Sequence, residues 1–187
     1  MIEIKNISFS YGEKKVFENF SLTVKSRERI CLTARSGRGK TTLLRLITGL
    51  EKPQSGEIKT DESTKFSCVF QEDRLLPHHT VLRNLSLFGD VKRAKILLDR
   101  LGIGAEASKY PNTLSGGMKR RVALARALIR QADVYIFDEP FTGLDDTTKK
   151  SAAELINESC KDKTVILVSH ETDDAKLLNA EIVDISE

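Results

Sequence analysis

Residues 29–50 read RICLTARSGRGKTTLLRLITGL, and this stretch decides the fold because three patterns follow one another in it. Arg29–Thr33 is an apolar run of the kind that forms a buried strand. Residues 34–42 are rich in glycine and small polar side chains, as in a tight loop. A strand, a loop and a helix in this order predict an α/β protein. The helix is predicted over residues 40–50, with Leu43, Leu46, Ile47 and Leu50 on its apolar face.

The loop itself nearly matches the phosphate-binding pattern GxxxxGK[ST]. Small residues let backbone N–H groups converge on a phosphate at the positive end of the following helix. Lys40 adds a charge suited to β- and γ-phosphates, and the Thr41 hydroxyl is a possible Mg²⁺ ligand. The candidate nucleotide-binding residues are Ala34, Arg35, Ser36, Gly37, Arg38, Gly39, Lys40, Thr41 and Thr42.

The loop departs from the pattern at one position, because Ala34 stands where the first glycine belongs. Alanine accepts fewer backbone conformations than glycine. We expect Ala34 to keep an ordinary strand-end conformation, since it directly continues Arg29–Thr33. The alternatives are a strained loop that binds nucleotide weakly, or a glycine-rich turn with a surface lysine.

Two adjacent acids follow a second apolar run, residues 134–137, which reads VYIF. Such a run suits the centre of a parallel sheet, whose carboxyl edge forms the ligand crevice. Asp138 is placed there to hold Mg²⁺, and Glu139 to polarise an attacking water. The alternative is a solvated turn, which the nearby phosphate loop makes less plausible.

The rest of the chain alternates strands and helices, with one insertion. Residues 1–9 and 16–24 alternate apolar and polar side chains, which predicts an antiparallel sheet at the start. Residues 72–113 differ, and we interpret them as an inserted, mostly helical piece with a helix at 91–101 ended by Gly102. The adjacent His78 and His79 are interpreted as loop residues, with a metal site as the alternative.

A strong helix is predicted over residues 115–130, with Ser115 as its N-cap. Its basic side chains are interpreted as the solvated polar face of an amphipathic helix rather than a nucleic-acid surface. These side chains are Lys119, Arg120, Arg121, Arg126 and Arg130.

Composition excludes several classes of protein. The chain has 187 residues, enough for one domain, and its 40% hydrophobic residues exclude a disordered chain. The formal net charge of +3 does not favour nucleic acid as a partner. We expect no secretory signal at the start, and no apolar run approaches the roughly 20 residues of a membrane span. Three scattered cysteines, Cys31, Cys68 and Cys160, suggest ordinary thiols in a reducing cytosol.

Residues 114–121 read LSGGMKRR and resemble the signature of the ATP-binding-cassette (ABC) ATPases. The resemblance covers nearly the whole chain, because further motifs of that family follow in the right order. It implies that Tyr11 stacks on adenine, that Gln71, Glu139 and His170 are catalytic, and that Thr41, Gln71 and Asp138 bind the metal. The residues that match the signature and D-loop are Ser115, Gly116, Gly117, Met118 and, in the D-loop, Asp145.

The resemblance also implies the fold and the domain organisation. We expect a P-loop NTPase (RecA-like) α/β core with an N-terminal antiparallel β subdomain and an inserted helical subdomain. Residues 1–187 would be a single domain, with its core at 1–71 and 133–187 and the helical subdomain at about 72–132. The chain would be a compact cassette.

The implied function is an ATP-hydrolysing subunit that powers solute transport through a separate membrane-spanning permease, with ATP and Mg²⁺ as cofactors. Two cassettes would pair as a homodimer, with ATP between the phosphate loop of one and the signature of the other. A solute-binding protein is a further possible partner, and the chain would lie on the cytoplasmic face of the cell membrane. Residues 71–84 resemble importer ATPases of the nitrate, sulfonate and taurine type. The alternatives are a degenerate cassette with weak hydrolysis and a soluble ABC ATPase without transport.

Overall fold

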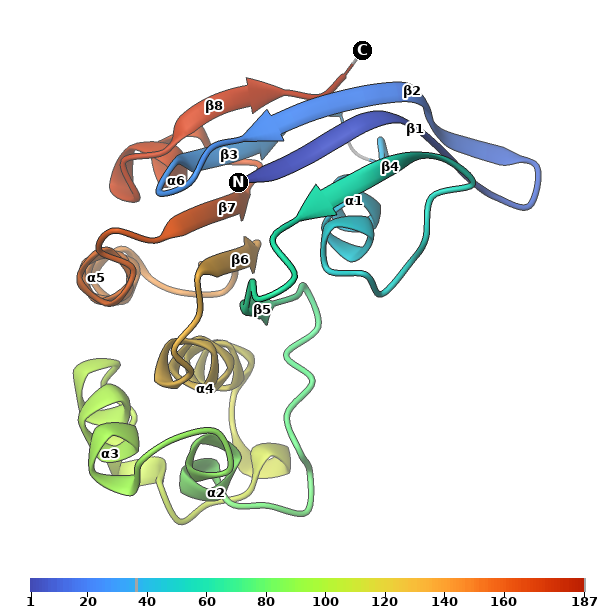
Figure 1. Cartoon of the computed structure of the whole chain (residues 1–187). Coiled ribbons are helices and arrows are strands. Elements are labelled where there is room, and N and C mark those ends of the chain that lie inside the picture. The colour runs from blue at the N-terminus through green and yellow to red at the C-terminus, as the bar shows by residue number, and fades with distance from the viewer. Residues whose placement is uncertain (36, 187) are drawn as a thin grey trace.

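The structure, a computed structural model, describes residues 1–35 and 37–186, so the expectation for Ser36 lies outside the described residues. Two sheets form its upper part, and a group of helices lies below them (Figure 1). The first sheet is antiparallel, as predicted, in the order β2-β1-β4. Its strands are β1 (Ile2–Tyr11), β2 (Lys14–Val24) and β4 (Ser55–Thr60).

The second sheet is parallel throughout and runs in the order β5-β6-β7-β3-β8. Its central strands are buried on both faces, because alternate side chains enter two different cores. In β6, for example, Ile136 packs towards the antiparallel sheet, while Tyr135 and Phe137 pack towards the lower helices. The strands are β3 (Arg29–Thr33), β5 (Phe66–Val69), β6 (Val134–Asp138), β7 (Thr164–Val168) and β8 (Glu181–Asp184).

The helices predicted at 40–50, 91–101 and 115–130 are all present, and the structure adds further helices that the sequence analysis did not predict. The predicted helix at 40–50 is shorter in the structure and ends at Ile47, so Leu50 lies beyond it and is exposed rather than on the buried face. Gly102 has the positive φ of a helix-ending glycine, as expected. The helices are α1 (Lys40–Ile47), α2 (Val81–Ser86), α3 (Val91–Arg100), α4 (Gly116–Ile129), α5 (Asp146–Ser159) and α6 (Thr172–Leu177), with 3₁₀ turns η1 (Gly104–Glu106) and η2 (Pro111–Thr113).

Helix α4 corrects one prediction. It lies between the parallel sheet and the helices α2 and α3, so it is covered on more than one side (Figure 1). Arg120, which we assigned to a solvated polar face, is only 3% exposed. The polar-face interpretation is therefore wrong for Arg120, because the side chain finds buried carbonyl partners that the sequence pattern does not reveal.

In the part of the chain that the structure describes, no helix combines the length and apolar character that crossing a membrane requires. His78 and His79 lie in the loop before α2, as predicted. The carbonyl of His79 accepts a hydrogen bond from the buried side chain of Asn84.

Candidate nucleotide-binding site

The glycine-rich loop joins β3 to α1 and sets the position of Lys40, the first residue of that helix. Lys40 is 8% exposed, and its Nζ donates a 2.9 Å hydrogen bond to the carbonyl of Ala34. Gly39 caps the helix with φ 98°, and a Cβ there would lie 2.3 Å from Cγ1 of Val16. Only glycine meets both conditions, so the loop depends on Gly39 for its shape.

Ala34 adopts an ordinary conformation. Its φ is not positive, in contrast to Gly37 and Gly39 in the same loop. This agrees with the expectation that Ala34 simply continues β3. Nothing in its backbone indicates the strained loop that was the alternative.

The carboxyl end of β6 faces the loop, as predicted for Asp138. The Thr41 hydroxyl donates a 2.7 Å hydrogen bond to Oδ2 of Asp138, which is 2% exposed. Burial raises the pKa of Asp138, and this effect outweighs the lowering by Thr41 and by the charges of Arg120 and Lys40. A buried carboxylate beside a hydroxyl is an arrangement of hard oxygen ligands suited to Mg²⁺.

Glu139 has an unusual backbone conformation, with φ 54°. Its N–H donates to the carbonyl of Val168, and its Oε1 lies 3.2 Å from Nε2 of His170. This approach is an ion pair only when the imidazole is protonated. Oε1 is otherwise buried without a hydrogen-bond donor among the described residues. Burial raises the pKa of Glu139, although the charge of His170 lowers it.

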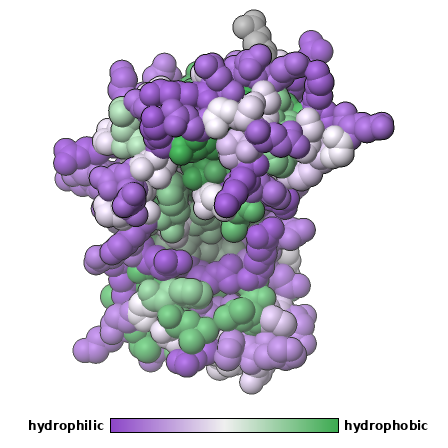
Figure 2. Space-filling model, turned by 45° about the vertical axis from the view of Figure 1, so that its right-hand side comes forward, coloured by the Kyte–Doolittle hydropathy of each residue, from purple (hydrophilic) through white to green (hydrophobic). Residues whose placement is uncertain are grey.

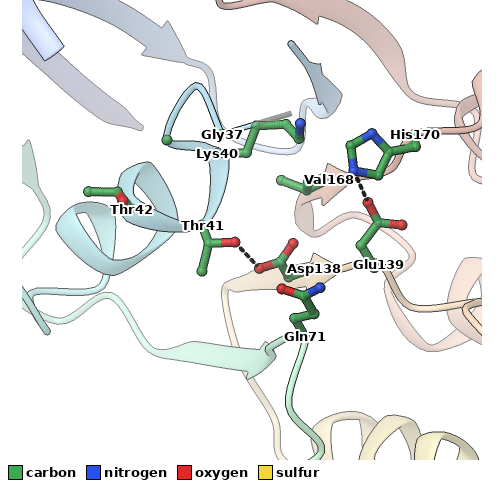
Figure 3. Close-up of a pocket in the computed structure, with 10 residues that line it drawn as sticks. Gly37, Lys40, Thr41, Thr42, Gln71, Asp138, Glu139, Val168 and His170 are labelled. Carbon is green, nitrogen blue, oxygen red and sulfur yellow. Dashed lines mark hydrogen bonds and ion pairs between the residues drawn. The ribbon is translucent and has the colours of Figure 1, made fainter. Parts of the chain in front are cut away.

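These side chains line one pocket of about 280 Å³ (Figure 3). Gln71 reaches it from the segment after β5, and its side chain points towards Asp138 in the view of Figure 3. The predicted catalytic and metal-binding residues are therefore brought together. The lining residues are Gly37, Gly39, Lys40, Thr41, Thr42, Gln71, Asp138, Glu139, Val168 and His170.

Other predicted nucleotide-binding residues lie outside this pocket. Tyr11 is 43% exposed at the end of β1 and packs edge-on against Phe9, with 4.9 Å between ring centroids. Arg35 is exposed, and Arg38 borders a smaller hollow of about 130 Å³ against β2. Their contacts with a nucleotide stay predictions.

The predicted signature and D-loop residues lie next to each other and away from the pocket lining. Oγ of Ser115 accepts a hydrogen bond from the N–H of Met118 and caps α4, as predicted. Gly117 approaches Gly143 so closely that a Cβ on Gly117 would lie 2.6 Å from the Gly143 carbonyl oxygen. Asp145 is exposed and caps α5 through the N–H of Thr148. Together with the half-buried Met118 and the exposed Gly116, they form a surface at the start of α4 and α5.

Sequence reasoning missed two residues that support the site. Val168 lines the pocket and holds the backbone of Glu139 through its carbonyl. Arg120 donates hydrogen bonds to the backbone carbonyls of Gln71 and Glu139. Val168 was predictable as the end of a buried strand beside β6, but nothing in the basic cluster distinguished Arg120 from its neighbours.

The sequence and the fold were compared with those of known proteins, and both match one family. The sequence profile of the family described as ABC transporter matches residues 17–142. The chain belongs to the ABC transporter family. It is an ATPase cassette of that family.

Relatives of this ABC cassette are import proteins. It is 38% identical over 185 residues to the aliphatic sulfonates import ATP-binding protein SsuB 1 of Paracoccus denitrificans, covering 95% of this chain and 76% of that protein. It is 39% identical over 191 residues to the formylaminopyrimidine import ATP-binding protein ThiZ of Halalkalibacterium halodurans, covering 96% and 77%. The resemblance to importer ATPases of the sulfonate type is confirmed.

Solved structures confirm the fold class. The dimeric bacterial ABC transporter cassette MJ0796 superposes with a TM-score of 0.88 at 31% identity, covering 100% of this chain and 94% of that one. A dimeric post-hydrolysis state of MJ0796, bound to ADP and Pi, superposes with a TM-score of 0.86 at 30% identity.

Proposed function

We propose that this ABC ATPase is the subunit that hydrolyses Mg²⁺–ATP to drive an importer, using the pocket between the glycine-rich loop and the carboxyl ends of β6 and β7. The observation that carries the proposal is the convergence of Lys40, Thr41, Asp138 and Glu139 in one pocket. A buried lysine beside two carboxylates matches what phosphoryl transfer needs, namely charge to hold phosphates and a base to orient water.

The oxygen atoms in the pocket fit a magnesium ion. Thr41 Oγ1 and Asp138 Oδ2 already lie 2.7 Å from each other, and Gln71 lines the same pocket. Hydroxyl, carboxylate and amide oxygens are ligands that Mg²⁺ accepts. Thr41, Asp138 and Gln71 are the residues that would hold the ion, which would neutralise charge on the phosphates.

Glu139 is the base in this proposal. Among the described residues its buried Oε1 accepts no hydrogen bond and approaches Nε2 of His170 at 3.2 Å, and as a carboxylate Glu139 would accept a proton from the attacking water. His170, beside Glu139, would contact the γ-phosphate. Lys40 supplies positive charge at the start of α1, where backbone N–H groups also favour an anion.

A second copy of the chain completes the site in this proposal. Ser115 caps α4, and Gly116 and Gly117 begin its first turn, where the helix N-terminus has a partial positive charge. These residues would contact the γ-phosphate of ATP bound to the partner in a head-to-tail homodimer. Tyr11 would stack on adenine, and Asp145 would lie at the dimer interface. The dimeric state of the related MJ0796 cassette supports a second copy as the partner.

The membrane permease is the partner proposed for the groove between the parallel sheet and the helices. The groove, of about 370 Å³, has an aromatic lining and a rim of arginines. Apolar side chains also gather over the lower, helical part of the surface (Figure 2). An apolar helix with acidic residues on the permease would match this surface in shape and charge. The groove is lined in part by Leu50, Phe66, Phe70, Phe88, Arg74, Arg126 and Arg130.

The SsuB and ThiZ relatives support import of a small organic solute. We also propose a solute-binding protein as a further component. In this proposal the cassette binds the inner face of the cell membrane through the permease. We propose that residues 1–187 form one functional domain, with a core at 1–71 and 133–187 and a helical subdomain at about 72–132.

The test is ATP hydrolysis by the purified chain, measured over a range of protein concentrations with and without Mg²⁺. We expect Mg²⁺-dependent turnover per chain that rises with concentration as dimers form. Lys40→Ala should weaken ATP binding itself, because the pocket loses its buried charge. An unchanged ATP dissociation constant for Lys40→Ala would contradict the proposed phosphate site.

A further inference from the structure

Arg120 lies in the second turn of α4, and its buried side chain donates several hydrogen bonds to residues that carry the pocket lining. Its side chain is 4% exposed, and all three of its guanidinium nitrogens donate hydrogen bonds. The acceptors are the carbonyls of Phe70, Gln71, Asp138 and Glu139 and the carboxylate of Asp73.

These acceptors belong to two separate segments of the site. Phe70 and Gln71 follow β5, and Asp138 and Glu139 end β6 and begin the next loop. Nη1 donates 2.6 Å to the carbonyl of Phe70 and 3.3 Å to that of Gln71. Nη2 contacts the carbonyls of Asp138 and Glu139. A planar guanidinium reaches both segments at once, which a lysine ammonium cannot do with the same geometry.

The contact with Glu139 matters because that residue is strained. A glutamate with φ 54° lies in the left-handed region, which persists only where the surroundings hold it. Two constraints hold it here. Its N–H donates 2.9 Å to the carbonyl of Val168, and its own carbonyl accepts from Nε and Nη2 of Arg120 at 3.1 and 2.6 Å.

We propose that Arg120 is a positioning residue for ATP hydrolysis. It fixes the backbones of Gln71 and Glu139 relative to each other and ties both to α4. The N-cap of that helix is Ser115, which the proposed function places against the partner's ATP. Arg120 therefore connects α4 to the backbone of Gln71, the proposed metal ligand, and to the backbone of Glu139, the proposed base. The inference rests on the proposed function, and it does not give Arg120 any direct contact with ATP.

The experiment compares Arg120→Gln with a matched control, Arg29→Gln. Arg29 also holds several carbonyls with one guanidinium, donating to Leu178, Cys160 and Asn157. It does so at the start of β3, away from the pocket lining. Both variants remove an arginine that joins distant segments, so general loss of stability affects both. Arg120→Lys is the second variant, because it keeps the charge and loses the fork.

Measurements are the steady-state kcat and KM for ATP, the ATP dissociation constant and the melting temperature of each variant. We expect Arg120→Gln to lower kcat at least 30-fold while its ATP dissociation constant stays within threefold of the parent's. Arg29→Gln should keep kcat within twofold at temperatures where it is folded. The kcat of Arg120→Lys should also fall at least tenfold. This second variant tests the inference if Arg120→Gln does not fold.

Two outcomes would overturn the inference. One is a kcat within twofold of the parent's for a folded Arg120→Gln or Arg120→Lys chain. The other is a loss that appears as weaker ATP binding or is matched by Arg29→Gln, since that indicates a general structural effect. The parent and Glu139→Gln serve as references. If the parent hydrolyses ATP and Glu139→Gln does not, the proposed function stands whatever Arg120 shows.

Discussion

The Thr41 hydroxyl and Oδ2 of Asp138 are joined by a 2.7 Å hydrogen bond, although 97 positions separate the two residues in the chain. The bond links the start of α1 to the end of β6 across the parallel sheet. It sets a hydroxyl and a buried carboxylate at the distance that two ligands of one small cation can share.

Thr41→Val should therefore weaken the use of Mg²⁺ more than the binding of nucleotide. Valine keeps the shape of threonine but offers no oxygen to the metal and no donor to Asp138. We expect the Mg²⁺ concentration for half-maximal turnover to rise at least tenfold, which corresponds to about 1.4 kcal/mol. Titration of Mg²⁺ at saturating ATP measures this half-maximal concentration. Thr41→Ser is the control, since it restores the hydroxyl and should behave like the parent.

Glu139→Gln should abolish turnover and leave ATP binding nearly intact. The amide keeps the size of the side chain and cannot accept a proton from water, so we expect kcat to fall at least 100-fold, or about 2.7 kcal/mol in the barrier. A fluorescent ATP analogue measures binding in the same samples. Hydrolysis at the parental rate would show that another group is the base.

The pH profile of hydrolysis should reflect the burial of Glu139. Burial raises the pKa of this carboxyl above its ordinary value of 4.5. The base acts only when deprotonated, so activity is full at pH values above the raised pKa and falls as the pH drops through it. We expect the acidic limb of kcat above pH 4.5, in samples whose circular dichroism shows a folded chain. A flat profile down to pH 4.5 would remove Glu139 from this role.

Ala34→Gly should change ATP affinity by less than threefold. The φ of Ala34 is not positive, so glycine relieves no strain there. The added chain entropy of glycine in the unfolded state should lower stability by about 0.4–1 kcal/mol. The parent and the Ala34→Gly chain are compared, each with Glu139→Gln to prevent turnover. ATP titration gives the affinity, and thermal unfolding gives the stability. A tenfold gain in affinity would instead favour a weak, degenerate site.

Sequence alone predicted the parts of the site that depend on local patterns. The glycine-rich loop, with Lys40 at the start of a helix, follows from residue types within a few positions of one another. The approach of Asp138 to that loop follows from a general property of parallel sheets, whose carboxyl ends share one edge. The fold class follows from the alternation of buried strands with helices.

What sequence could not predict depends on the environment that the rest of the chain provides. Arg120 has the same local context as Arg121, yet only Arg120 turns towards buried carbonyls at the ends of β5 and β6. Leu50 continues the helical period, but α1 ends at Ile47 and leaves it exposed. Periodicity fixes which side chains share a face of a helix. It does not fix where the helix stops or what packs on its other side.

The signature residues Ser115 and Gly116 do not line the pocket formed by the described residues of their own chain. In the proposed dimer, a single subunit separated from its permease would hold ATP without the contacts that complete the site. Under this proposal, the separation of the two half-sites would limit the consumption of ATP by free subunits. Turnover would then be confined to places where two copies are held side by side, so that assembly of the transporter would itself activate hydrolysis.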